Sequence, residues 1–472
     1  MVGIRAYGVY VPLYRLGPET KGWYGRNEKA VANADEDAIT MSVAAAINCL
    51  DGIDRSQIDG LFFASTTSPY RQKQSAAMVA TALDLRPDVL TADFANSLRA
   101  GTTAIRTAVD IIKGSSARQI LVTAADLRTP KSHSEFEPLF GDGGAAVLIS
   151  NTDIGVSIED SCTMTDEILD EWVADTENFP RGWENRFVFE KGYLRVFSQV
   201  VNELMKKTGL TSGDFTKAAF YGPAERRHTD MARKLGFDPK TQLQNGMFNT
   251  MGNTGTPFPI MILAAALDEA KAGDKILFGS YGDGADVFYL LATENIDKIK
   301  AKRKIKQYLE SKKILPDYVT TYAWWRGLIE VVPSARRPRL EVPEAPVRLR
   351  LRDKNIRFYG VKCKNCGYPQ YPPTRICTRC QTKDQFEPYR FSDKSCTLFT
   401  YSSDYLGSTM DPPLVGAMVD FEGGGRAMLQ MVDRDVSQLK LGMPLELTFR
   451  KLYSIDGIHN YYWCCTPLRI SD

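Results

Sequence analysis

Four cysteines within one short segment carry the clearest chemical motif of this 472-residue chain. Cys363 and Cys366 form one C-x2-C pair, and Cys377 and Cys380 form a second pair after ten intervening residues. Two such pairs can present four thiolates to one ion in the tetrahedral arrangement that zinc prefers. The spacing therefore predicts a structural zinc site without an open coordination position. Iron in a rubredoxin-like site and four unrelated structural cysteines are the alternatives.

The overall composition limits the classes of partner. The formal net charge of +2 gives no bias toward nucleic acid or acidic lipid. The N-terminal residues lack the pattern of a signal peptide, and no apolar run is long enough to span a bilayer. We therefore expect a cytoplasmic protein that binds neither nucleic acid nor a membrane, a compartment in which clustered cysteines indicate a metal rather than disulfides.

Residues 1–295 show the alternation of strands and helices that is typical of an α/β sheet. Apolar strands are predicted at 3–11, 60–66 and 118–126, and helices are predicted after the acidic residues 35–37, at 74–84 and at 101–114. The order Gly101-Thr102, helix, strand and GDGGAAVLIS (141–150) recurs as Gly255-Thr256, helix, strand and GDGADVFYLL (282–291). This echo favours a duplicated α/β fold with halves at about 1–160 and 161–295, although a chance repeat of a common turn is the alternative.

The remaining residues indicate three further segments. Residues 296–355 begin with a Lys-rich stretch at helical spacing, predicted to be a solvated connecting helix, and continue as a proline-containing linker. The cysteine motif lies in a predicted zinc ribbon at 356–390. Five short strands follow between 391 and 472 and predict a small OB-type β-barrel, with a three-strand sandwich fragment as the alternative.

Three segments of the first part resemble the hydroxymethylglutaryl-CoA synthases of the thiolase superfamily. They are GIRAYGVYVPLYRL (3–16), SLRAGTTAIRTAVD (97–110), and FYGPAERRHTDMARKLGF with GNTGT (220–256). The resemblance implies a thiolase-like, duplicated five-layer α/β fold, a homodimer and a coenzyme A thioester as substrate. The ribbon and barrel resemble a zinc-ribbon/OB-fold family that accompanies thiolase-like enzymes and is thought to bind acyl-CoA.

The resemblance also assigns roles to positions of this chain. Leu98 stands where related synthases have the nucleophilic cysteine, so the route through an acyl-cysteine is closed. Tyr221 replaces a histidine that polarises the thioester carbonyl, and Asn253 retains a residue of the oxyanion hole. Ser97 is a substitute nucleophile by position, although a helix N-cap or turn hydroxyl, with capping favoured, is the simpler interpretation. Tyr221, Asn253 and Ser97 are therefore the candidate catalytic residues.

Other titratable residues give weaker signals. The chain has three histidines, of which His228 lies in a polar helical segment and is expected to face solvent. Glu135 and Glu137 precede the first GDG turn, where a carboxylate could reach the pocket, but they are expected to be exposed loop residues.

Three functions remain open. The first is carbon–carbon bond formation or cleavage on a CoA thioester by aldol or retro-Claisen chemistry without an acyl-cysteine. Some thiolase-fold steroid aldolases likewise lack the cysteine, use tyrosines and bind a zinc-ribbon/OB partner. The second is acyl transfer of the hydroxymethylglutaryl-CoA synthase type through Ser97 or a non-covalent route. The third is a non-catalytic acyl-CoA-binding partner protein.

Overall fold

The computed structural model describes residues 1–330, 342, 344–407 and 409–470. Its N-terminal part is built on one nine-stranded sheet. In sheet order the strands are β11 (Lys217–Phe220), β12 (Lys275–Tyr281), β13 (Gly284–Ala292), β8 (Val156–Thr165), β1 (Gly3–Tyr10), β7 (Gly143–Ser150), β6 (Gln119–Asp126), β4 (Gly60–Ser65) and β5 (Leu90–Ala95). β6 and β7 are buried along their whole length, as expected for strands covered on both faces.

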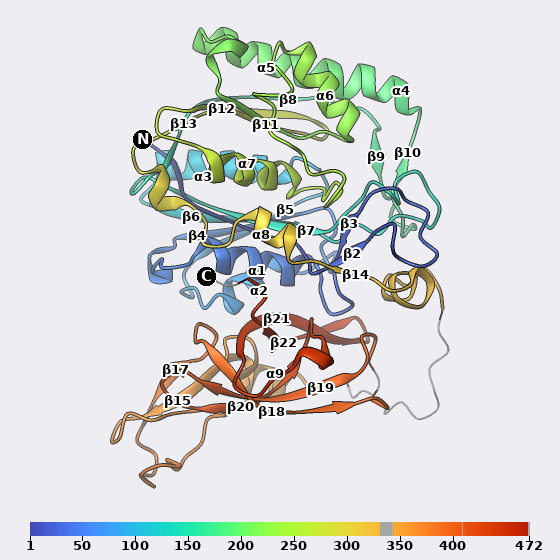
Figure 1. Ribbon diagram of the computed structural model, residues 1–472. Coiled ribbons are helices and arrows are strands. Elements are labelled where there is room, and N and C mark those ends of the chain that lie inside the picture. The colour runs from blue at the N-terminus through green and yellow to red at the C-terminus, as the bar shows by residue number, and fades with distance from the viewer. Residues whose placement is uncertain (331–341, 343, 408, 471–472) are drawn as a thin grey trace.

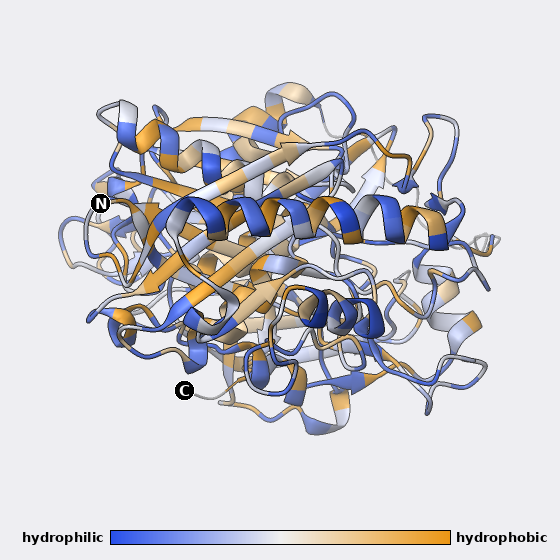
Figure 2. Ribbon diagram, turned by 90° about the horizontal axis from the view of Figure 1, so that it is seen from above, coloured by the Kyte–Doolittle hydropathy of each residue, from blue (hydrophilic) through white to orange (hydrophobic). Residues whose placement is uncertain are grey.

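Strands and helices are stacked in five alternating layers, as the resemblance implied (Figure 1). One outer layer lies beside β8 and β11–β13 and holds α4 (Asn185–Val188), α5 (Arg195–Thr208) and α6 (Glu225–Lys234). The other outer layer lies beside β1 and β4–β7 and holds α1 (Ala38–Cys49) and α2 (Ser75–Ala82). The central layer holds α3 (Ala100–Gly114) and α7 (Phe258–Glu269). Figure 2 views the molecule from the side of the outer helices, where a mixed helical surface covers largely hydrophobic strands.

The repeated sequence pattern corresponds to a repeated structural unit. In the first half β4 runs parallel to β6, and β6 pairs antiparallel with β7. In the second half β11 runs parallel to β12, and β12 pairs antiparallel with β13. The two central helices approach closely at Gly101, where a Cβ atom would lie 3.1 Å from Ile260 Cδ1 and 3.3 Å from the Thr256 carbonyl oxygen. A larger residue at Gly101 would therefore press against the loop that precedes α7.

The Lys-rich stretch does not form the single helix that its spacing predicted. The structure has a short 3-10 helix at Ile296–Ile299, α8 at Ile305–Glu310 and β14 at Lys313–Ile314. Ile296, Ile299 and Ile305 are buried, and β14 pairs in parallel with β2 (Tyr14–Leu16). Packing and strand pairing along the first domain thus override the helical pattern. The prolines at 331–341 and 343 of the predicted linker lie outside the described residues.

The C-terminal part contains a small ribbon and a closed barrel. The ribbon strands are β15 (Tyr359–Cys363), β16 (Pro369–Gln370) and β17 (Phe386–Arg390). The barrel strands, in barrel order, are β18 (Cys396–Asp404), β19 (Leu414–Phe421), β20 (Arg426–Met431), β22 (Ile458–Pro467) and β21 (Pro444–Ile455). Because five strands close, the OB-type prediction is confirmed and the sandwich alternative is wrong.

The barrel packs against the start of α1 (Figure 1). The backbone N–H of Lys451 donates to the Asp35 carbonyl at 2.8 Å. Arg450, buried at this contact, forms ion pairs with Asp35 at 2.9 Å and Glu36 at 3.0 Å. The two parts are thus joined by buried charged groups as well as by the connecting segment. Across the residues that the structure describes, no helix combines the length and apolar character needed to cross a membrane.

Candidate active site

A cavity of about 250 Å³ brings together the three positions that the resemblance singled out, Leu98, Tyr221 and Asn253. Six aromatic rings and several charged groups complete its wall. The lining residues are Leu98, Glu135, Phe136, Leu139, Phe140, Asp170, Glu171, Asn185, Phe189, Tyr193, Tyr221, Pro223, Ala224, Arg227, Asn253 and Tyr281.

The strand topology explains why two tyrosines meet there. β11 and β12 are parallel, and Phe220 at the end of β11 lies opposite Gly279 of β12. Tyr221 directly follows β11 and Tyr281 ends β12, so both side chains leave the sheet at the same edge. The carboxyl ends of parallel strands are the usual place for ligands in α/β proteins.

Asn253 holds the phenol of Tyr221. Its Nδ2 donates to Tyr221 Oη at 3.2 Å and to the Gly222 carbonyl at 3.4 Å. Its Oδ1 accepts from the Gly255 N–H at 2.9 Å and from Arg128 Nη1 at 3.3 Å, which fixes the orientation of the amide. Because Tyr221 Oη accepts from Asn253 and no described residue accepts its proton, that proton is free to donate to a ligand.

The surroundings of Tyr221 keep it protonated. Its side chain is buried, with 3% of the residue exposed. Burial, followed by the negative charge of Glu171, raises the pKa of Tyr221 above its usual range, against the opposing effect of Arg128. A neutral phenol in this place is a hydrogen-bond donor suited to an oxygen that gains negative charge.

Arg128 organises one wall and was missed from the sequence. Its guanidinium forms an ion pair with Glu171 and lies 3.3 Å from the ring centre of Phe140. Its backbone N–H donates to Asp142 Oδ1 at 2.8 Å. An arginine two residues beyond a predicted strand was the available sequence signal, but only the structure shows that it is buried and reaches Asn253.

Asp170 and Tyr281 form a second polar group that the sequence analysis missed. Burial, and then the charge of Glu171, raises the pKa of Asp170 to about 6. Tyr281 is 2% exposed, and its hydroxyl has no well-formed hydrogen bond among the described residues. Burial and the nearby charge of Asp170 raise the pKa of Tyr281. The cavity therefore contains a carboxylate suited to take up a proton near neutral pH and, beside it, a second phenol.

Ser97 lies beside the cavity rather than in its wall. Its hydroxyl donates to the Gly282 carbonyl at 3.1 Å. The N-cap of α3 is Arg99, which makes no side-chain capping bond, so the helix-capping interpretation of Ser97 is wrong. The adjacent Leu98 does line the cavity, and it presents an aliphatic side chain where related synthases have the nucleophilic thiol.

Two expectations about exposure are wrong. His228 is 3% exposed and packs against the rings of Phe220 and Phe248, with centroid distances of 4.9 and 5.6 Å. Burial lowers the pKa of His228 to about 4, so it is neutral at physiological pH. Glu137 is fully buried and accepts hydrogen bonds from Tyr24 and Tyr318, at 2.9 and 2.6 Å. Helix α6 turns its His228 side toward the sheet, and aromatic hydroxyls cover Glu137.

Glu135 is exposed, as predicted, and its carboxylate accepts a 2.6 Å hydrogen bond from Asn185 Nδ2. Since both residues line the cavity, this bond closes part of its rim.

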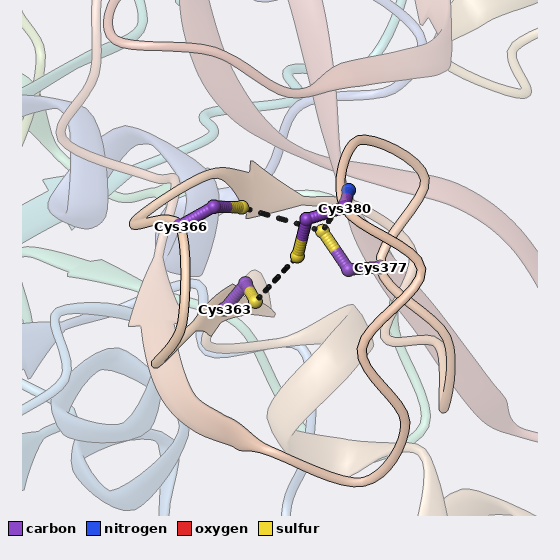
Figure 3. A group of neighbouring side chains, drawn as sticks. All are labelled: Cys363, Cys366, Cys377 and Cys380. Atoms are coloured by element: carbon purple, nitrogen blue, oxygen red, sulfur yellow. Dashed lines mark hydrogen bonds between the residues drawn. The ribbon is translucent and has the colours of Figure 1, made fainter.

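The four cysteines of the ribbon converge as a metal site requires (Figure 3). Their sulfur atoms all lie within 4.8 Å of one another. Cys363 Sγ is 3.6 Å from Cys380 Sγ, and Cys366 Sγ is 3.5 Å from Cys377 Sγ. A hydrogen bond from Thr382 lowers the pKa of Cys380 to about 5, which favours the thiolate. The four sulfurs fit a structural zinc ion, which would hold the two turns of the ribbon together.

Known protein families match segments in both the N-terminal and the C-terminal part of the chain. Residues 92–167 match the family model 3-oxoacyl-[acyl-carrier-protein] synthase III, and residues 354–387 match ChsH2, rubredoxin-like zinc ribbon domain. A hydroxymethylglutaryl-CoA synthase from Thermococcus gammatolerans is 34% identical over 330 residues, which is 67% of this chain and 94% of the relative. One from Methanosphaera stadtmanae is 31% identical over 347 residues, which is 70% of this chain and 100% of the relative.

Solved structures show the same fold. The HMG-CoA synthase PksG from Bacillus subtilis superimposes with a TM-score of 0.59 at 20% identity, covering 69% of this chain and 89% of that one. A crystal structure described as an HMG-CoA synthase complexed with CoA gives a TM-score of 0.61 at 19% identity, covering 73% and 94%. Because the curated relatives match nearly along their whole length, this chain belongs to the hydroxymethylglutaryl-CoA synthase family of the thiolase superfamily, with a zinc ribbon and a closed barrel at its C-terminus.

Proposed function

We propose that this protein is an enzyme that forms or cleaves a carbon–carbon bond next to a CoA thioester by aldol chemistry, without an acyl-cysteine. The observation that carries the proposal is Tyr221, which offers a free phenolic proton to a cavity in which Leu98 replaces the nucleophile. The relatives named as hydroxymethylglutaryl-CoA synthases and the related structure with bound CoA support a CoA thioester as substrate.

In the cleavage direction the substrate is a β-hydroxyacyl thioester. The Asp170 carboxylate accepts the proton of the β-hydroxyl group, and the new carbonyl forms as the Cα–Cβ bond breaks. The electron pair of that bond moves into the thioester enolate, whose oxygen receives hydrogen bonds from Tyr221 and Tyr281. Asp170 then returns the proton to Cα. The products are a carbonyl compound and an acyl-CoA, so no water, oxidant or external acceptor is consumed.

The roles of the neighbouring residues follow from their contacts. Both N–H groups of the Asn253 amide face acceptors within the protein, at Tyr221 Oη and the Gly222 carbonyl. We therefore assign Asn253 to the positioning of Tyr221, and Arg128 to the positioning of Asn253. Acyl transfer through Ser97 is the less favoured route, because its hydroxyl already donates to Gly282 and lies outside the cavity wall.

Tyr221→Phe tests this function. The substitution removes one hydroxyl, so turnover should fall by about 10²- to 10³-fold, the usual cost of losing one donor to a developing oxyanion. Binding of the CoA ester should change little, as measured by titration calorimetry. Tyr405→Phe, at an exposed position of the barrel, is the matched control. A Tyr221→Phe enzyme with the wild-type rate would remove Tyr221 from the mechanism.

A further inference from the structure

The cavity is larger than the smallest acyl groups require. An engineered cavity of about 150 Å³ in another protein is enough to hold benzene, whereas this cavity measures about 250 Å³. The smallest β-hydroxyacyl group, 3-hydroxypropionyl, has only five heavy atoms, one fewer than benzene, so it would leave much of this space unfilled. Unfilled space beside the apolar part of the wall loses packing contacts, so a ligand that fills it binds more tightly.

The wall of the cavity is suited to a ring. Phe136 and Phe140 are stacked with centroids 4.9 Å apart, and Tyr193 lies edge-on to Tyr281 at 5.3 Å. Phe189 adds a further ring beside Tyr193, at 5.9 Å. Aromatic rings in such offset and edge-to-face arrangements accept another ring with specific geometry as well as apolar contact.

The position of Leu98 adds to this apolar character. It lines the cavity, where it adds an aliphatic surface rather than a polar or reactive group. The polar groups that can act on the thioester, Tyr221 and Asp170, occupy the same cavity as the rings. One ligand can therefore present its reacting carbons to the polar groups and an apolar ring to the aromatic wall.

We propose that the acyl chain of the substrate carries a ring-sized apolar group, with an aromatic ring as the best fit. This inference rests on the proposed function, because it assumes that a CoA thioester enters the cavity. It goes further by defining the class of acyl group, and it assigns Phe136, Phe140 and Phe189 to the selection of that group.

The experiment compares two CoA thioethers that cannot be cleaved and that differ only in methyl against phenyl, acetonyl-CoA and phenacyl-CoA. Titration calorimetry on the full chain should give phenacyl-CoA an affinity at least tenfold higher than that of acetonyl-CoA. Equal affinities, or tighter binding of acetonyl-CoA, would overturn the proposal. The measurement needs no turnover, so it can succeed or fail independently of the Tyr221 experiment.

Variants that fill the cavity test whether the preference for phenacyl-CoA arises there. Ala224 lines the cavity in an extended backbone conformation that leucine also adopts, so Ala224→Leu should weaken phenacyl-CoA at least tenfold and acetonyl-CoA less than twofold. Leu98→Phe is a second filling variant with the same expected pattern. Ala77→Leu makes the same chemical change on the exposed side of α2 and should alter neither affinity. If both filling variants weaken the two ligands equally, or neither, the ring does not occupy this cavity and the proposal is wrong.

Discussion

The rate of the reaction should depend on the ionisation of Asp170. Burial and the charge of Glu171 raise the pKa of this carboxyl group to about 6. A general base must be deprotonated, so the active fraction is about 90% at pH 7 and about 10% at pH 5. We therefore expect kcat/KM to fall by about tenfold for each pH unit below 6, and to level off above pH 7.

The assay is a pH–rate profile of kcat/KM for wild type and Asp170→Asn, measured with a β-hydroxyacyl-CoA thioester. The amide keeps the shape of the side chain but cannot accept the proton, so the rate at pH 7 should drop by about 10²- to 10⁴-fold. The residual rate should lose its dependence on pH near 6. Asp297→Asn, which changes an exposed carboxylate outside the cavity, should leave the profile unchanged.

Two results would refute this reasoning. A wild-type profile that is flat between pH 5 and 7 would mean that no group with a pKa near 6 in the free enzyme controls kcat/KM. If kcat/KM of Asp170→Asn still falls below pH 6 as in wild type, another group is responsible for that pH dependence.

Three further predictions concern the stability and assembly of the chain. The protein should contain about one zinc ion per chain by elemental analysis. Because the ion joins the two turns of the ribbon, Cys377→Ser should reduce the zinc content and lower the melting temperature of the C-terminal part. Burial raises the pKa of Glu36 to about 7, so the folded state binds the carboxyl proton of Glu36 more tightly than the unfolded state does. The stability that this proton binding contributes is lost as the pH rises from about 4.5 to 7. From pH 5 to pH 8 the free energy of unfolding of Glu36→Gln should therefore rise relative to that of wild type by about 1–3 kcal/mol in chemical denaturation. A difference between the two proteins that does not change with pH would contradict this. We also propose a homodimer through the edge strand β5, where Leu90 is 50% exposed, so Leu90→Lys should halve the mass found by light scattering. An unchanged dimer mass would exclude this edge as the contact.

Local patterns in the sequence predicted the fold well, because they act over short distances. The cysteine spacing alone brings four sulfurs together, and the alternation of apolar segments matches β4, β6, α2 and α3 closely. His228 was misplaced because the charged residues around it suggested a fully exposed helix. Its spacing to Met231 and Ala232, three and four residues on, matches the buried side of α6 and was the missed signal.

The site could be predicted only where the family resemblance extended. Leu98, Tyr221 and Asn253 lie far apart in the sequence, and the resemblance placed all three in what proves to be one cavity. Asp170 and Arg128 come from segments without a motif, and their roles depend on distances to Tyr281 and Asn253 that no local pattern encodes. The roles of Asp170 and Arg128 therefore follow from tertiary packing, whereas the sequence resemblance was enough to find the other three positions.

Hydrogen bonds through the loop before α1 connect the fused barrel with this site. Every residue that lines the cavity precedes the barrel in the chain, so the barrel contributes no lining group. Asp433 of the barrel accepts a 2.9 Å hydrogen bond from Asn33 Nδ2, and the N–H of the preceding Ala32 donates to Asp142 Oδ2 at 2.8 Å. The other oxygen of Asp142 receives the backbone N–H of Arg128, whose guanidinium holds Asn253. Because this series of hydrogen bonds connects the barrel with Tyr221, kinetic measurements belong on the full chain.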